Sequence, residues 1–122
     1  MASEAQVVLV VEDDDDIREV MIEILTERGY TVCLARHGAE ALKQLRTGPR
    51  PGIILLDLTM PVMDGWAFCR EKQQDPALDP IPVLVTSAVS PRDPRNESLR
   101  AASYMTKPLD LHELLASIRR HW

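Results

Sequence analysis

The sequence contains no spacing of cysteine and histidine that would suit a zinc site or a thiol redox site. Its two cysteines, Cys33 and Cys69, are far apart, one in an expected strand and one in an expected helix. Metal and redox sites usually place two cysteines within a few residues of each other. We therefore interpret both as buried free thiols in a reducing compartment. The isolated histidines His37, His112 and His121 are poor candidates for a catalytic base or a metal ligand.

The sequence also lacks a basic excess and a long apolar run. It has 14 Lys and Arg against 19 Asp and Glu, a net charge of -5. Nucleic acid and anionic membranes demand a positive field, so direct binding to either is not expected. The first six residues have neither the basic region nor the apolar core of a targeting segment. These absences predict a soluble cytoplasmic protein with no nucleic-acid or membrane partner.

Neither of the two common glycine-rich nucleotide loops occurs, and no internal repeat is visible. A chain of 122 residues with 45% apolar side chains can bury one proper core. We expect a single domain over residues 1–122, with its core at about 7–121 and no output domain in this chain.

Short β-branched runs alternate with segments of helical periodicity along the chain. The runs predict strands at residues 7–11, 30–35, 53–56, 83–86 and 103–106. The periodic segments predict helices at 14–28, 39–46, 64–74 and 110–121, with a short one that starts no earlier than Pro94. Such alternation indicates an α/β fold with a parallel sheet covered on both faces. All strand carboxyl ends then meet at one edge.

Polar residues follow four of these strands at that edge. They are Glu12 and Asp13, Asp57, Ser87 and Lys107. Carboxylates about 5 Å apart would repel by roughly 3 kcal/mol per pair at an effective dielectric near 20. They would therefore take up protons or bind a cation, and an all-oxygen site near phosphate chemistry favours Mg²⁺.

Asp57 interrupts an apolar strand, where a carboxylate is costly unless water, a cation or donors meet it. Taken alone, it could be an ordinary turn residue. Together with Lys107 and the Ser87 hydroxyl it outlines a phosphoryl site, in which Asp57 would be the nucleophile.

Four motifs, in order and at proper intervals, resemble the receiver domain of bacterial response regulators, of the type seen in the chemotaxis regulator. They occupy residues 10–14, 56–65, 82–88 and 104–108. The resemblance implies a flavodoxin-like (βα)5 doubly wound parallel sheet with strand order 2-1-3-4-5. It also implies a two-component or phosphorelay signalling function in which the chain is a switch and not a conventional enzyme.

The resemblance implies roles for the residues of the edge. Asp57 is the phosphoacceptor, and Mg²⁺ is held by Glu12, Asp13, Asp57 and the backbone carbonyl of Thr59. The phosphoryl donor is a histidine kinase or a histidine phosphotransfer protein.

Three further residues carry the switch by the same resemblance. Ser87 is the switch hydroxyl, Lys107 contacts the phosphoryl group, and Tyr104 is the aromatic that reorients with it. A cis peptide bond is expected between Lys107 and Pro108.

This sequence departs from the family's common pattern at several positions. Glu12 replaces the more frequent Asp, Ser87 replaces Thr, and Arg100 stands near a common glycine. Val89 stands at a position that tunes dephosphorylation in such regulators. Its apolar side chain could not orient the attacking water by hydrogen bonding. Segment 90–95 is rich in proline, which puts the fourth helix in doubt.

We expect an unknown output protein on the face formed by the fourth helix, the fifth strand and the fifth helix. Local positive charge there favours an acidic partner; it comes from Arg92, Arg95, Arg100, Arg119 and Arg120.

Ordinary structural interpretations compete at other positions. Asp15 and Asp16 suit capping or solvated residues in a first helical turn, and Asp64 suits a helix start. Trp66 suits packing, while Trp122 is either a packing anchor or an artefact of truncation.

Two other functions are alternatives. One is a phosphorylation-independent scaffold, which the complete acidic, hydroxyl and lysine set disfavours. The other is a phosphotransferase of the haloacid-dehalogenase type, but Thr59 stands where that family needs a second acid.

Overall fold

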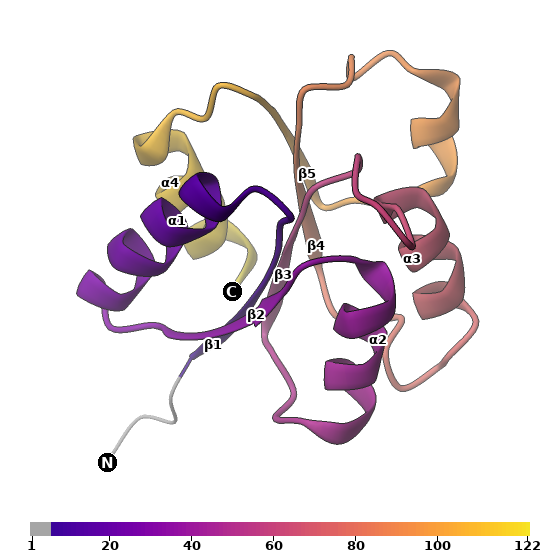
Figure 1. Ribbon diagram of the computed structural model, residues 1–122, viewed down its shortest axis with the longest axis horizontal. Helices are drawn as coiled ribbons and strands as arrows, with labels where there is room; N and C mark the ends of the chain where they lie inside the picture. The colour runs from indigo at the N-terminus through magenta and orange to yellow at the C-terminus, as the bar shows by residue number, and fades with distance from the viewer. Residues whose placement is uncertain (1–5) are drawn as a thin grey trace.

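The computed structural model describes residues 6–122 and shows a five-stranded parallel sheet between two layers of helices (Figure 1). The strands are β1 (Val7–Val11), β2 (Thr31–Ala35), β3 (Ile53–Leu56), β4 (Val83–Ser87) and β5 (Ser103–Thr106). Their order is β2-β1-β3-β4-β5, and each neighbouring pair is parallel. The predicted fold class and strand order are confirmed. Residues 1–5 of the expected domain lie outside the described residues.

The α-helices in this part of the chain are α1 (Asp15–Glu27), α2 (Gly38–Thr47), α3 (Gly65–Gln73) and α4 (Leu111–His121). Each begins after a residue whose side chain accepts a hydrogen bond from one or two backbone N–H groups of the first turn. This is the usual way to satisfy these donors. These N-cap residues are Asp14, His37, Asp64 and Asp110. No helix among residues 6–122 combines the length and apolar character needed to cross a bilayer.

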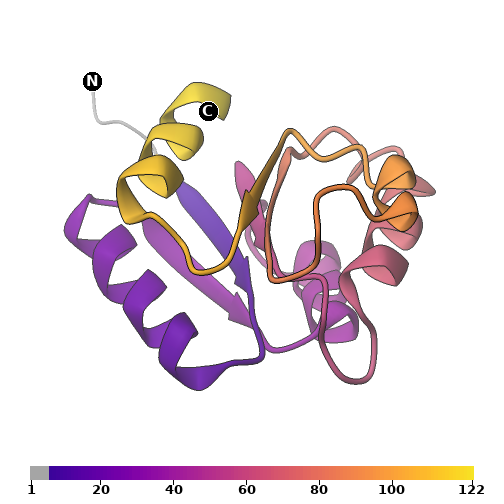
Figure 2. The same ribbon diagram turned by 90° about the horizontal axis from the view of Figure 1, so that it is seen from above.

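Helices α1 and α4 cover one face of the sheet, and α2 and α3 cover the other (Figure 2). Successive strand residues point to opposite faces, so each strand supplies both cores. Val8, Val10 and Ile53 pack towards α1 and α4. Leu9 and Val11 pack towards α2 and α3. This explains why the strands read as continuous apolar runs in sequence.

The fourth connection corrects one prediction, because it carries a 3-10 helix, Pro94–Ser98, and not an α-helix. Pro91 and Pro94 restrict the backbone, and no side chain between Pro94 and Ser98 is buried. With no apolar stripe to pack, only a short 3-10 segment forms. Asp93 caps it by accepting from the amide of Arg95 at 2.9 Å.

Within residues 6–122, two non-glycine residues have a positive φ, Val62 at 68° and Arg100 at 53°. Arg100 therefore adopts the left-handed backbone for which a glycine would be the ordinary choice at its position. The ring of Trp122 packs against the domain, although the residue is 41% exposed. Its ring stacks on Tyr30 at 5.5 Å and lies so close to Gly52 that an added Cβ there would meet the indole at 2.6 Å. Trp122 is a packing residue.

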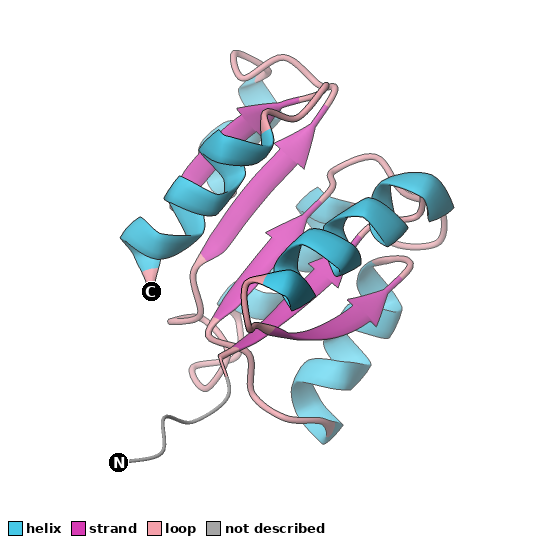
Figure 3. Ribbon diagram, turned by 90° about the vertical axis from the view of Figure 1, so that its left-hand side faces the viewer, coloured by secondary structure: helices cyan, strands magenta, loops and turns pink. Residues whose placement is uncertain are grey.

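The carboxyl ends of the strands open onto one edge of the sheet, as the parallel arrows in Figure 3 show. Strands β1 and β3 are neighbours although β2 separates them in sequence. This is the point where the strand order reverses, and open parallel sheets bind their ligands in the crevice at such a point.

Candidate functional site

Three carboxylates gather where β1 and β3 end. Glu12, Asp13 and Asp57 each offer an oxygen, and these oxygens all lie within 4.8 Å of one another. Backbone bonds continue past the strands and fix the positions, because the amide of Asp57 donates to Val11 O at 3.0 Å. The cluster expected from sequence is therefore present in the structure.

Two of these carboxylates are buried and share one cation. Glu12 is 1% exposed and Asp57 is 4% exposed, while Asp13 is exposed. The Nζ of Lys107, directly after β5, lies 2.7 Å from Glu12 Oε1 and 3.6 Å from Asp57 Oδ2. Lys107 thus pairs with two of the three acids, and carboxylates outnumber the lysine at this site.

Asp57 responds to this charge. Burial, followed by the negative charge of Glu12, raises the pKa of Asp57 from its ordinary value to about 7. The positive charge of Lys107 and a hydrogen bond from the Thr59 amide act in the opposite direction. A carboxylic acid that holds its proton near neutral pH in this setting would lose that proton to solvent when a cation binds to the carboxylate.

The donor set suits a hard divalent ion such as Mg²⁺. It consists of carboxylate oxygens, and no histidine or cysteine of the described residues joins the cluster. Such oxygen-only sets favour Mg²⁺ over zinc. Thr59 has an exposed side chain and donates its amide to Asp57 Oδ1 at 3.4 Å. The ligand role of its carbonyl stays a prediction.

Arg18 supports the site and was not anticipated from sequence. It is 8% exposed, donates through Nη1 to the carbonyl of Glu12 at 3.0 Å, and forms an ion pair with Asp15. Asp15 is therefore more than a solvated residue. Asp14, the helix cap, also donates its amide to Glu12 Oε2 at 3.2 Å. A sequence signal existed, because Arg18 precedes the buried Met21 by three residues and so lies on the apolar face of α1.

The loop after Asp57 depends on a glycine. A Cβ on Gly65 would lie 2.7 Å from the Asp57 carbonyl and 2.8 Å from the Leu58 Cα. The Gly65 amide donates to Leu58 O at 2.9 Å, which holds the start of α3 against the end of β3. Asp64 caps α3 by accepting from the Ala67 amide at 2.9 Å, as predicted.

Ser87 and Tyr104 meet at the backbone of Val89. The Ser87 Oγ accepts from the Val89 amide at 3.1 Å, and the Tyr104 hydroxyl donates to the Val89 carbonyl at 2.8 Å. The Lys107 amide donates to Ser87 O at 2.8 Å, and the bond between Lys107 and Pro108 is cis, as expected. The end of β4 thus contacts both the predicted aromatic and the lysine of the site.

The 3-10 segment is attached to α3. The indole of Trp66 is 7% exposed and donates to Asn96 Oδ1 at 3.0 Å. The guanidinium of Arg95 lies 3.9 Å from the Trp66 ring centroid and pairs with Asp93. Trp66 packs, as predicted, and it also anchors this segment.

The arginines expected on an output face lie on different layers. Arg95 belongs to the 3-10 segment beside α3, and Arg119 belongs to α4 on the other side of the sheet (Figure 2). Arg95 is already paired with Asp93. Arg92, Arg119 and Arg120 are exposed and form no ion pair among the described residues.

Solved structures of similar sequence share this fold. The signal receiver domain of a signal transduction histidine kinase from Syntrophus aciditrophicus is 36% identical, with a TM-score of 0.87 over 95% of this chain and 89% of that chain. The phosphorylated cyanobacterial phytochrome response regulator RcpA is 30% identical, with a TM-score of 0.81 over 96% and 91%. The Mn²⁺-bound response regulator Rcp1 is 30% identical, with a TM-score of 0.79 over 94% and 90%.

Sequence relatives and a family model agree with the structures. The response regulator MprA of Mycobacterium ulcerans is 40% identical over 114 residues, which are 92% of this chain and 48% of MprA. The chain thus spans about half the length of the curated relatives it matches. The model of the response regulator receiver domain matches residues 8–119. The chain therefore belongs to the response regulator receiver domains of two-component systems.

Proposed function

We propose that Asp57 accepts a phosphoryl group from a phosphohistidine in a Mg²⁺-dependent reaction, and that this phosphorylation switches the binding of a partner protein. The observation that carries the proposal is the arrangement around Asp57. Its buried carboxylate lies within 4.8 Å of Glu12 and Asp13 and 3.6 Å from the Lys107 ammonium. Receiver domains are signalling switches, and RcpA, named above, is a phosphorylated member.

The chemistry divides between the residues of the site. An Asp57 oxygen attacks the phosphorus of the donor, a P–O bond forms as the P–N bond breaks, and the leaving imidazole keeps the electron pair and is protonated. Lys107 offers a positive charge to a phosphoryl oxygen. Mg²⁺, held by Glu12, Asp13 and Asp57, would neutralise charge on the carboxylates and on the transferred group. Thr59 would contribute its carbonyl to the ion.

The switch would act through the backbone of Val89. Ser87 and Tyr104 both bind that residue, at 3.1 and 2.8 Å. A phosphoryl group on Asp57 that draws the Ser87 hydroxyl towards it would change the contacts of Val89 and free the Tyr104 hydroxyl to reorient. Phosphorylation of Asp57 would thus shift the population of the domain between two conformations. The output protein would read this change on the face formed by the 3-10 segment, β5 and α4.

The donor would be a histidine kinase or a histidine phosphotransfer protein that docks beside Lys107. A groove of about 350 Å³ lies there between α1 and the loop after β5. Its lining is mostly apolar and includes Val20 and Leu111, which are 47% and 37% exposed. An apolar helix face on the donor would cover these side chains. We place the reaction in the cytoplasm, where the free thiols of Cys33 and Cys69 would stay reduced.

The test is incubation with phosphoramidate, a small phosphoryl donor, followed by measurement of the intact mass. We expect one phosphoryl group per chain in the presence of Mg²⁺ and none in EDTA. A scaffold that works without phosphorylation would show no added mass in either condition. Nothing favours the dehalogenase-type alternative, because the residue two positions after Asp57 is Thr59, which has no carboxylate to serve as the second acid.

A further inference from the structure

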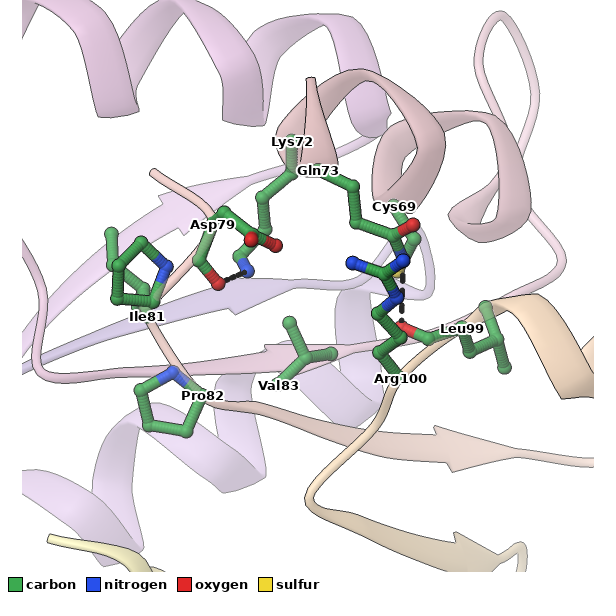
Figure 4. Close-up of a pocket in the computed structure, with 10 residues that line it drawn as sticks. Cys69, Lys72, Gln73, Asp79, Ile81, Pro82, Val83, Leu99 and Arg100 are labelled. Carbon is green, nitrogen blue, oxygen red and sulfur yellow. Dashed lines mark hydrogen bonds between the residues drawn. The ribbon is translucent and has the colours of Figure 1, made fainter. Parts of the chain in front are cut away.

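Two cationic side chains, Lys72 and Arg100, lie at the edge of the sheet opposite Asp57. Lys72 and Gln73, in the last turn of α3, face Arg100 across a cavity of about 110 Å³ that opens beside the start of β4 (Figure 4). We call it the Lys72 pocket; its lining also includes Cys69, Asp79 and the chain from Pro80 to Val83.

The ammonium of Lys72 is buried and has no ion-pair partner among the described residues. The residue is 4% exposed, and its Nζ donates to the carbonyl of Asp79 at 2.8 Å. Among the described residues it forms no ion pair, although an ammonium has three donors. A buried charge without a counter-charge is costly. Burial accordingly lowers the pKa of Lys72.

No other group buried in the pocket supplies a negative charge. Burial raises the pKa of the Cys69 thiol to about 12, so it stays protonated. Asp79 is exposed and forms no ion pair with Lys72 in this part of the chain. The negative charge of Asp79 nevertheless acts to raise the pKa of Lys72, while Arg50, which donates to the carbonyl of Ala77, acts to lower it.

Arg100 supplies the opposite wall of the pocket. Its guanidinium forms no ion pair within residues 6–122. The amide of Gln73 holds the preceding backbone by donating to Ser98 O at 2.8 Å and Leu99 O at 3.2 Å. A buried cation of α3 and an exposed cation of the chain before β5 thus line one cavity. The cavity is several times larger than the roughly 10–15 Å³ that a single water requires.

We propose that the Lys72 pocket binds a small tetrahedral oxyanion of the phosphate class, held by the ammonium of Lys72 and the guanidinium of Arg100. Charge-assisted bonds from both groups would offset the burial of the lysine. The bound ion would join the last turn of α3 to Arg100, in the connection that leads to β5. The competing role is a purely structural one, in which Lys72 only fastens the loop at Asp79.

The test is a titration of the protein with inorganic phosphate, followed by amide chemical shifts. EDTA removes divalent ions, so phosphate cannot bind through Mg²⁺ at the acidic cluster around Asp57. Chloride holds the ionic strength constant. We expect saturable shifts at residues 69–73, 79–83 and 99–100. Lys72→Met and Arg100→Gln should each weaken binding about tenfold or more, whereas Arg92→Gln, which removes an exposed arginine outside the pocket, should not.

Shifts that grow linearly without saturation would overturn the proposal, as would saturable shifts that Arg100→Gln leaves unchanged. The arginine variant decides the question if Lys72→Met does not fold, because Arg100 is exposed. Equal binding of acetate would also contradict it, since a carboxylate lacks the tetrahedral oxygens. The result does not depend on whether Asp57 accepts a phosphoryl group, because no Mg²⁺ or phosphoryl donor is present.

Discussion

The ammonium of Lys107 lies closer to Glu12 than to Asp57, at 2.7 Å against 3.6 Å. Lys107 therefore first neutralises the more deeply buried carboxylate. Lys107→Met should lower the free energy of unfolding in EDTA by about 2–3 kcal/mol, because it leaves two buried acids without a cation. Much of this loss should disappear in MgCl₂, where a divalent ion replaces the lysine charge. Urea denaturation in the two conditions measures both values.

Lys43→Met is the matched control for this experiment. Lys43 is exposed on α2 and forms no ion pair among the described residues. Its variant should change stability by less than about 0.5 kcal/mol in either solution. An equal loss for Lys107→Met with and without Mg²⁺ would show that the lysine does not act on the carboxylates.

The raised pKa of Asp57 predicts a pH dependence of stability in metal-free solution. The folded-state pKa, about 7, lies above the ordinary 3.8. Between these values the folded state binds a proton that the unfolded state has lost, so this residue's contribution falls as the pH rises from about 4 through 7. Asp57→Asn removes it. The variant should gain stability relative to the wild type between pH 5 and 8, as measured by urea denaturation in EDTA. A constant difference across this range would exclude the raised pKa.

Gly65→Ala should disturb the loop beside Asp57. The added Cβ would lie 2.7 Å from the Asp57 carbonyl, a backbone atom that cannot easily move. We expect a loss of about 1–3 kcal/mol in stability and slower labelling by phosphoramidate. Gly48→Ala is the control, because its Cβ would lie 3.0 Å from the Gln44 carbonyl, away from the site. Unchanged labelling kinetics in Gly65→Ala would show that this contact does not shape the acceptor loop.

Asn96→Ala should loosen the 3-10 segment without unfolding the domain. Asn96 accepts from Trp66 and donates to the carbonyls of Ser90 and Pro91, at 3.0 and 3.3 Å. Without these bonds, amide hydrogen exchange at residues 90–98 should accelerate while the central strands keep their protection. Arg92→Ala, on the same exposed segment, serves as the control. Equal exchange in both variants would mean that Asn96 does not hold the segment.

The sheet and the acidic cluster could be predicted because they depend on local signals. Continuous apolar runs specify buried parallel strands, and parallel order brings their carboxyl ends to one edge. Glu12, Asp57 and Lys107 therefore meet although up to 95 residues separate them. The positions of Asp64 and Gly65 also followed from ordinary helix-start chemistry.

The remainder depends on tertiary contacts that no short pattern encodes. Arg18 and Lys72 each occupy the buried face of a helix, but only the structure shows which carbonyl each one meets. The segment after β4 lacks an apolar stripe, so its 3-10 form and its attachment to Trp66 depend on the surface of α3. His37 caps α2 through its ring nitrogen, a role that its isolated position in sequence did not indicate.

The identity of the phosphorylated residue tests the central claim most directly. After labelling with phosphoramidate and Mg²⁺, borohydride reduces an aspartyl phosphate to homoserine, and peptide mass spectrometry locates the change. We predict homoserine at Asp57 and nowhere else, with no labelling of Asp57→Asn. Homoserine at Asp13 or Asp64, or labelling that survives Asp57→Asn, would contradict the assignment of Asp57 as the phosphoacceptor.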